Sequence, residues 1–246
     1  MTTYVYGIAS SAHPALPDGM EGIGKPACTV RVLKHGDLAA IVSDAPEDLK
    51  PKRRDLLAHQ NVLSEAGAAG SVLPMRFGSL APDDETVVSV LGERAEHYGE
   101  RLRALDGKVE YNVKASHNEQ AVLHQVLAEN QELRAMVEAN QRQGGGSQEE
   151  KLKLGEAVSN TVRAREQSDA VEVRRALEPT AEAIEPGPEG TGWLANISVL
   201  VHRDSAEGLL AAVEELRANQ PQLELRVHGP LPPYSFVDPG PSQPAE

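Results

Sequence analysis

The sequence predicts an α+β protein of two domains, the second ferredoxin-like with inserted helices. Three observations support this fold class. The chain has 246 residues, more than one average domain of about 150. Segments with strand and helix periodicity alternate along it. From residue 109 the order is strand, helices, strand, strand, helix, strand, which is the split βαβ order.

These observations place the domain boundaries. The turn signal Asp106-Gly107 precedes a fresh strand pattern, so we expect one domain over residues 1–106 and the ferredoxin-like domain over 107–237. The helical insertion of the second domain is expected over about 119–178. The polar residues 238–246 are expected to form a disordered tail.

Strands of the first domain are predicted by β-forming residues and alternation. Residues 3–9 contain Tyr, Val and Ile and end before a Ser- and Pro-rich loop. Residues 27–33 alternate and turn at His-Gly-Asp into 38–42, which predicts a hairpin. Residues 72–80 are expected to be extended and broken by Pro74 and Gly78.

Two amphipathic helices are expected in the same domain. The first covers 52–65, directly after Pro51. Its buried stripe is expected to hold Leu56, Gln60, Leu63 and Gly67, with Leu57 beside it. The second begins at the acidic residues 83–85, whose charges suit a helix N-terminus. Its stripe is expected to hold Val87, Leu91, Ala95, Tyr98, Leu102 and Leu105.

The second domain alternates between strand and helix signals. Its expected strands cover residues 109–115, 181–185, 193–201 and 223–227. Its expected helices cover a stripe from Val122 to Asn140, residues 148–177 and residues 206–218. The run Gly144-Gly145-Gly146-Ser147 lacks the Lys of a phosphate-binding loop, so we interpret it as a flexible linker between helices.

Composition excludes several classes of function. The net charge of −13 repels phosphate, which makes a nucleic-acid partner improbable. Cys28 is the only cysteine, so no intrachain disulfide or multi-cysteine metal site can form. The chain shows no signal-peptide pattern and no apolar run long enough for a membrane span. We therefore expect a soluble, intracellular protein.

No motif points to catalysis. The eight histidines are scattered without metal-ligand spacing, and surface or helix-cap roles are expected for them. No serine lies in the Gly-x-Ser-x-Gly turn of a hydrolase, and Cys28 is interpreted as an inert thiol on a strand. Glu110 is explained as a strand-edge or solvated residue. We expect no catalytic residue, no metal site, no cofactor and no enzymatic activity.

Two segments are candidates for partner binding. Arg76 and Phe77 lie in the extended segment between the first two helices, and both side-chain types are enriched at protein interfaces. The alternative is that Phe77 fills the core and Arg76 pairs with a nearby acid. The second candidate is the closing segment with Leu231, Pro232, Pro233, Tyr234 and Phe236. It either staples the C-terminus onto the domain or forms an extended docking edge.

Several of these segments together resemble a known family. They are Tyr-Val-Tyr-Gly-Ile at 4–8, Leu-Ala-Ala-Ile-Val-Ser at 38–43, the helix with His59, Val-Leu-Pro-Met-Arg-Phe-Gly-Ser at 72–79, Val-Glu-Tyr-Asn-Val-Lys at 109–114, Leu-Gly-Glu at 154–156 and Gly-Pro-Leu-Pro-Pro-Tyr-Ser-Phe at 229–236. In this order they are similar to the gas vesicle protein F and L family. Leu231 stands where the family commonly has Trp, and Ser79 where Thr is usual, which bears on the choice between the F and L types.

The resemblance implies a non-enzymatic accessory protein of gas vesicle assembly, and thus of cell buoyancy. It implies binding to the hydrophobic shell protein and other accessory proteins, in a chaperone- or nucleation-like role, in the cytoplasm or on the gas vesicle. Two alternatives from other classes are an enzyme of unknown chemistry and a small-molecule-sensing regulator, because ferredoxin-like scaffolds host many functions.

Overall fold

The computed structural model describes residues 1–187, 190 and 192–238. By its internal contacts the chain divides into two units. Unit 1 is Met1–Glu110 with the described residues from Gly229 onward, and unit 2 is Tyr111–His228. The segment from Gly229, which we expected in the second domain, therefore groups with the first unit. The domain limits themselves stay a prediction, and residues 239–246 of the expected tail lie outside the described residues.

An antiparallel sheet forms the centre of unit 1. Its strands are β1 (Thr3–Ser10), β4 (Arg31–His35), β5 (Leu38–Asp44), β6 (Val72–Pro74) and β7 (Leu80–Ala81). They follow the order β4-β5-β1-β6, and β7 also pairs with β1. The short strands β2 (Glu21–Gly24) and β3 (Ala27–Thr29) form a separate two-stranded sheet. The expected hairpin forms as β4–β5, with Gly36 in its turn at a φ of +56°. Its first strand begins only at Arg31, because residues 27–29 of the expected strand pair with β2 instead.

Helix α1 (Arg53–Ala69) turns a different face to the sheet than we expected. Its buried residues are Asp55, His59, Val62, Leu63 and Ala66. Leu63 is buried as expected, but Leu56 of the expected stripe and Leu57 beside it are 41% and 54% exposed, so the predicted face was wrong for both. The reason is tertiary, because Asp55 accepts a hydrogen bond from the Gly24 amide in β2 at 3.0 Å.

The second expected helix of unit 1 is interrupted. It forms α2 (Asp84–Glu93) and α3 (Ala95–Ala104), which meet at Arg94. The acidic start is correct, since the Asp83 side chain caps α2 by accepting from the Thr86 amide. Val87, Leu91, Tyr98, Leu102 and Leu105 are buried as expected. Ala95 is exposed because the break at Arg94 changes the helical phase.

Unit 2 contributes most of a four-stranded sheet. Its strands are β8 (Lys108–His117), β9 (Ala183–Pro186), β10 (Ala195–His202) and β11 (Leu223–Leu231). The order β11-β8-β10-β9 is the 4-1-3-2 order of a ferredoxin-like fold. Helices α6 (Gln148–Leu177) and α7 (Ala206–Asn219) pack against each other and against β10. The α+β fold class is therefore confirmed.

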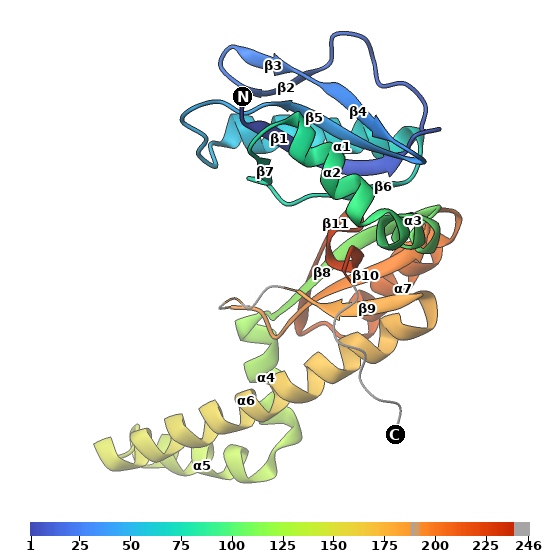
Figure 1. Cartoon of the computed structure of the whole chain (residues 1–246). Helices are drawn as coiled ribbons and strands as arrows, with labels where there is room; N and C mark the ends of the chain where they lie inside the picture. Colours follow the sequence, from blue (N-terminus) through green and yellow to red (C-terminus); the bar gives the residue numbers. More distant parts are fainter. Residues whose placement is uncertain (188–189, 191, 239–246) are drawn as a thin grey trace. The chain divides into compact units, whose positions relative to one another are not determined.

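The inserted helices form a layer of their own within unit 2. Helices α4 (Glu119–Glu129) and α5 (Gln131–Arg142) lie beside the N-terminal half of α6, away from the sheet (Figure 1). Buried Val122, Val126 and Leu133 join them to α6. Ser147 and Glu150 start α6 with a reciprocal capping box, which explains why α6 begins directly after the glycine run.

No helix in the described part of the chain is both long enough and apolar enough to cross a membrane.

Candidate protein-binding site

The Arg76 turn, defined as residues 75–79, joins the short strands β6 and β7. Ser79 closes it, because its amide and hydroxyl donate to the Arg76 carbonyl oxygen at 3.2 and 2.8 Å. Gly78 has a φ of +91°, a conformation that residues with a Cβ rarely adopt. This geometry leaves the Arg76 side chain exposed, and no ion pair to it forms among the described residues. The pairing of Arg76 with a nearby acid, one half of the alternative, therefore does not form among the described residues.

A cluster of aromatic side chains packs against Phe77 of the Arg76 turn. Phe77 is half-buried and lies edge-on to Tyr4 and His59, with ring centroids 5.9 and 5.8 Å away. Tyr4 and Tyr6 pack at 4.8 Å, and Tyr6 stacks on His59 at 5.6 Å. Aromatic contacts of this kind add to the stability that burial alone supplies. Phe77 thus fills core while it leaves its neighbour Arg76 on the surface.

Hydrogen bonds fix the tautomer of His59, which contacts the backbone of the Arg76 turn. Its Nε2 lies 3.1 Å from the Met75 carbonyl oxygen, which can only accept, so Nε2 carries the proton. Its Nδ1 then accepts from the Tyr4 hydroxyl at 2.8 Å. The Tyr4 hydroxyl in turn accepts from the Gly78 amide at 3.2 Å. Burial lowers the pKa of His59 and raises the pKa of Tyr4, so both side chains are neutral at pH 7.

Two of the eight histidines therefore depart from the expected surface roles. His59 belongs to the core of unit 1. His117, whose side chain is 7% exposed, donates from Nε2 to Asp169 at 2.8 Å within unit 2. Sequence reasoning found no side-chain partner for either residue, because Tyr4 is 55 residues from His59 and Asp169 is 52 residues from His117 along the chain. A histidine inside a Val- and Leu-rich helix, as at position 59, was the available signal.

The C-terminal segment is fastened to unit 1 by hydrogen bonds. The Ser235 amide and hydroxyl donate to the two carboxylate oxygens of Glu110, each at 2.8 Å. Arg101 donates to the carbonyl oxygens of Phe236 and Val237 at 2.6 and 3.0 Å. Glu110 is only 4% exposed, so its interpretation as a solvated residue was wrong. Alternation along a strand places Glu110 on the face opposite to Val109 and Tyr111, so the sequence held no local signal for this buried role.

The same segment also packs through its side chains. Pro233 and Phe236 are buried, and Tyr234 packs against the aromatic cluster that supports the Arg76 turn. Burial, together with the charge of Glu110, raises the pKa of Tyr234 to about 12. Residues Tyr234–Phe236 form a 3₁₀ turn, so the expected extended backbone is wrong for them. Leu231 and Pro232 are half-buried.

The structure thus joins the two candidate segments on one aromatic cluster. Phe77 and Tyr234, far apart in sequence, pack on the same core of Tyr4 and Tyr6. Arg76 projects from this base to the surface.

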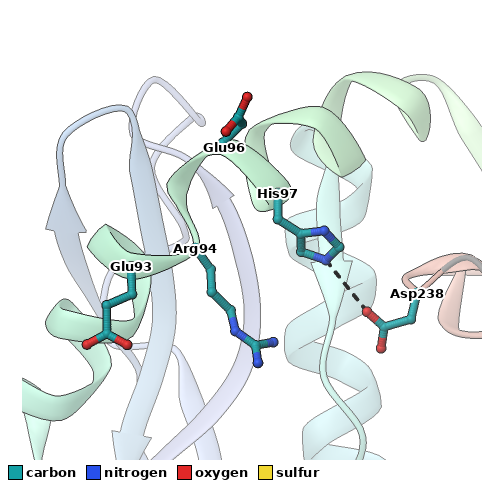
Figure 2. Close-up of a pocket in the computed structure, with 5 residues that line it drawn as sticks. All are labelled: Glu93, Arg94, Glu96, His97 and Asp238. Atoms are coloured by element: carbon teal, nitrogen blue, oxygen red, sulfur yellow. Dashed lines mark ion pairs between the residues drawn. The ribbon is translucent and has the colours of Figure 1, made fainter.

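An open pocket elsewhere in unit 1 is lined by ionisable side chains. Figure 2 shows His97 directed toward Asp238, and His97 Nε2 lies 3.7 Å from Asp238 Oδ1. The other lining residues are Glu93, Arg94 and Glu96. The lining contains no serine, cysteine or lysine that could act as a nucleophile, so it offers charge complementarity rather than covalent chemistry.

Metal binding was not expected from the dispersed histidines. Among the described residues, no three His, Cys, Asp or Glu side chains are grouped to hold a metal ion.

Comparisons with known proteins identify the family. The family model described as "Gas vesicle synthesis protein GvpL/GvpF" matches residues 2–238. The chain is 63% identical over 238 residues to gas vesicle protein F of Streptomyces sp. (strain CB03234), covering 97% of this chain and 100% of the relative. It is 27% identical over 256 residues to gas vesicle protein L of the same organism, covering 95% and 92%.

A solved structure shows the same fold. The crystal structure of GvpF from Anabaena sp. PCC7120 superposes with a TM-score of 0.76 at 24% sequence identity, covering 97% of this chain and 99% of that chain. With the family model matched from residue 2 to residue 238, this chain belongs to the GvpL/GvpF family of gas vesicle proteins.

Proposed function

We propose that this protein is an accessory factor of gas vesicle assembly that binds the hydrophobic shell protein and other accessory proteins. Its role is chaperone- or nucleation-like, and it acts in the cytoplasm or on the growing vesicle. Family membership supports a part in gas vesicle formation. The identity of 63% to an F protein, against 27% to an L protein, supports an F-type member.

The physical need for such a factor follows from the shell. A shell subunit with a large apolar face aggregates unless a partner covers that face before assembly. An exposed sheet edge is one surface that can do so, because its free backbone groups pair with an added strand.

The Arg76 turn carries the proposal. It lies where the sheet of unit 1 ends, since β6 and β7 each pair with β1 alone. Leu80 on β7 is 51% exposed and follows the turn directly. An unpaired Arg beside an exposed apolar residue, on a backbone held by His59 and Tyr4, is typical of an interface hot spot.

The closing segment contributes in two ways. Leu231, Pro232 and Tyr234 keep part of their surface exposed and are proposed to contact the partner together with Phe77. Pro233 and Phe236 are buried, so they act by holding this surface in place.

Substitution of Arg76 tests the site. Arg76→Ala should weaken capture of purified shell protein by about 1–2 kcal/mol, roughly 5- to 30-fold in Kd. Its free energy of unfolding should change by less than about 0.5 kcal/mol, because Arg76 is exposed and unpaired. Arg53→Ala is the matched control, since Arg53 is an exposed arginine of unit 1 on another element. Unchanged affinity in a folded Arg76→Ala variant, or equal loss in the control, would reject this site.

A further inference from the structure

Trp193, the only tryptophan of the chain, lies between two cations. The Lys114 Nζ is 5.3 Å from its ring centroid, and the Arg226 Cζ is 5.2 Å from it. All three residues belong to unit 2, and each keeps part of its surface exposed. Both distances fall within the range of a cation–π interaction. We call these three residues the Trp193 patch.

The patch occupies the sheet face opposite the helices. On β8, Lys114 lies between Val113 and Ala115, which are both fully buried. On the adjacent strand β11, Arg226 is exposed and follows buried Leu225. Because successive side chains of a strand point to opposite faces, both cations lie on the face away from the core.

The two cations, Lys114 and Arg226, form no ion pair with a carboxylate in the described part of the chain. Glu224, two residues before Arg226, already accepts a hydrogen bond from the Asn118 side chain at 3.1 Å. In a chain with a net charge of −13, two cations that form no salt bridge with a described residue converge on one partly exposed aromatic ring and form a local positive patch.

We propose that the Trp193 patch binds an acidic peptide segment of a protein partner. Lys114 and Arg226 contact its Asp or Glu carboxylates, and Arg226 offers the two parallel donors that suit a carboxylate. The Trp193 ring holds both cations in place and contributes apolar contact area. This site is separate from the Arg76 turn, and its test does not depend on shell-protein binding.

A protein segment fits the patch better than nucleic acid. Nucleic-acid platforms stack successive bases on several aromatic side chains. The patch offers one ring.

Tryptophan fluorescence reads this site directly, because Trp193 is the only source of the signal. The full chain is titrated with a blocked octapeptide of alternating Glu and Gly, and with the same peptide carrying Gln in place of Glu. We expect a saturable change in emission with the Glu peptide that weakens as NaCl is raised, and none with the Gln peptide. No saturable change with the Glu peptide, or an equal response to both peptides, would overturn the proposal.

A charge-matched pair of variants separates the patch from general attraction. Lys114→Gln with Arg226→Gln should weaken Glu-peptide binding at least tenfold. Arg134→Gln with Arg163→Gln removes the same charge from exposed, unpaired positions of the helical insertion and should leave binding unchanged. Equal weakening by both double variants, or tighter binding of oligothymidine than of the Glu peptide, would overturn the assignment.

Discussion

Removal of the Ser235 hydroxyl tests how the C-terminal segment is held. Ser235→Ala deletes the donor to one carboxylate oxygen of Glu110, a bond of 2.8 Å at a residue that is 4% exposed. Water cannot replace that donor freely at a buried site, and a hydrogen bond to a charged group contributes about 1.5–3 kcal/mol. We therefore expect the free energy of unfolding to fall by about 1.5–3 kcal/mol.

Urea denaturation followed by circular dichroism measures this loss, and the chain contains a matched control. Ser89 also donates from its hydroxyl to a glutamate, Glu93, at 2.9 Å, but on the exposed face of α2. Ser89→Ala should change the free energy of unfolding by less than about 0.5 kcal/mol. If Ser235→Ala lowers the free energy of unfolding no more than Ser89→Ala does, Glu110 does not hold the C-terminal segment in place. Our reasoning about the attachment of this segment would then fail.

Three further outcomes are expected. Burial lowers the pKa of His59 in the folded protein. As the pH falls through about 6.5, the imidazole of His59 is therefore protonated in the unfolded chain before it is protonated in the folded one. Below that pH, His59 lowers the free energy of unfolding by up to about 1.4 kcal/mol per pH unit. Urea unfolding at pH 7.5 and 5.5 should show a smaller pH dependence for His59→Gln, and an identical dependence would contradict the neutral state. Gly78→Ala should cost about 1–2 kcal/mol in the same assay, since its φ is +91° and no steric clash adds to the strain; a neutral effect would argue against this turn geometry. Chelation with EDTA should leave the thermal midpoint unchanged, because the described residues form no metal cluster, and a clear drop would reveal one.

Local signals were sufficient for most elements. The strand expected at 193–201 and the helix expected at 148–177 correspond to β10 and α6. For α6 the reason is visible at its N-terminus, where a glycine run, Ser147 and Glu150 mark the start. Alternation and helical periodicity act within a few residues, so they can be read from the chain alone.

The sequence predicted less reliably which face of an element is buried. In α1 the apolar Leu56 and Leu57 are exposed, while Asp55 and His59 are inside. Each buried polar group has a partner supplied by another element, Gly24 for Asp55 and Met75 for His59. A polar residue is stable in the core only when such partners are present, and periodicity carries no information about them.

The candidate binding site, too, was determined partly by the sequence and partly by the tertiary structure. Sequence by itself determined the α+β class, the strand and helix order of the second unit, and the selection of Arg76, Phe77 and the closing segment. Only the tertiary structure decided that Phe77 and Tyr234 pack on one aromatic cluster and that Glu110 binds Ser235. Contacts between residues more than 100 positions apart depend on how the whole chain packs, because no local pattern specifies which distant group will satisfy a buried charge.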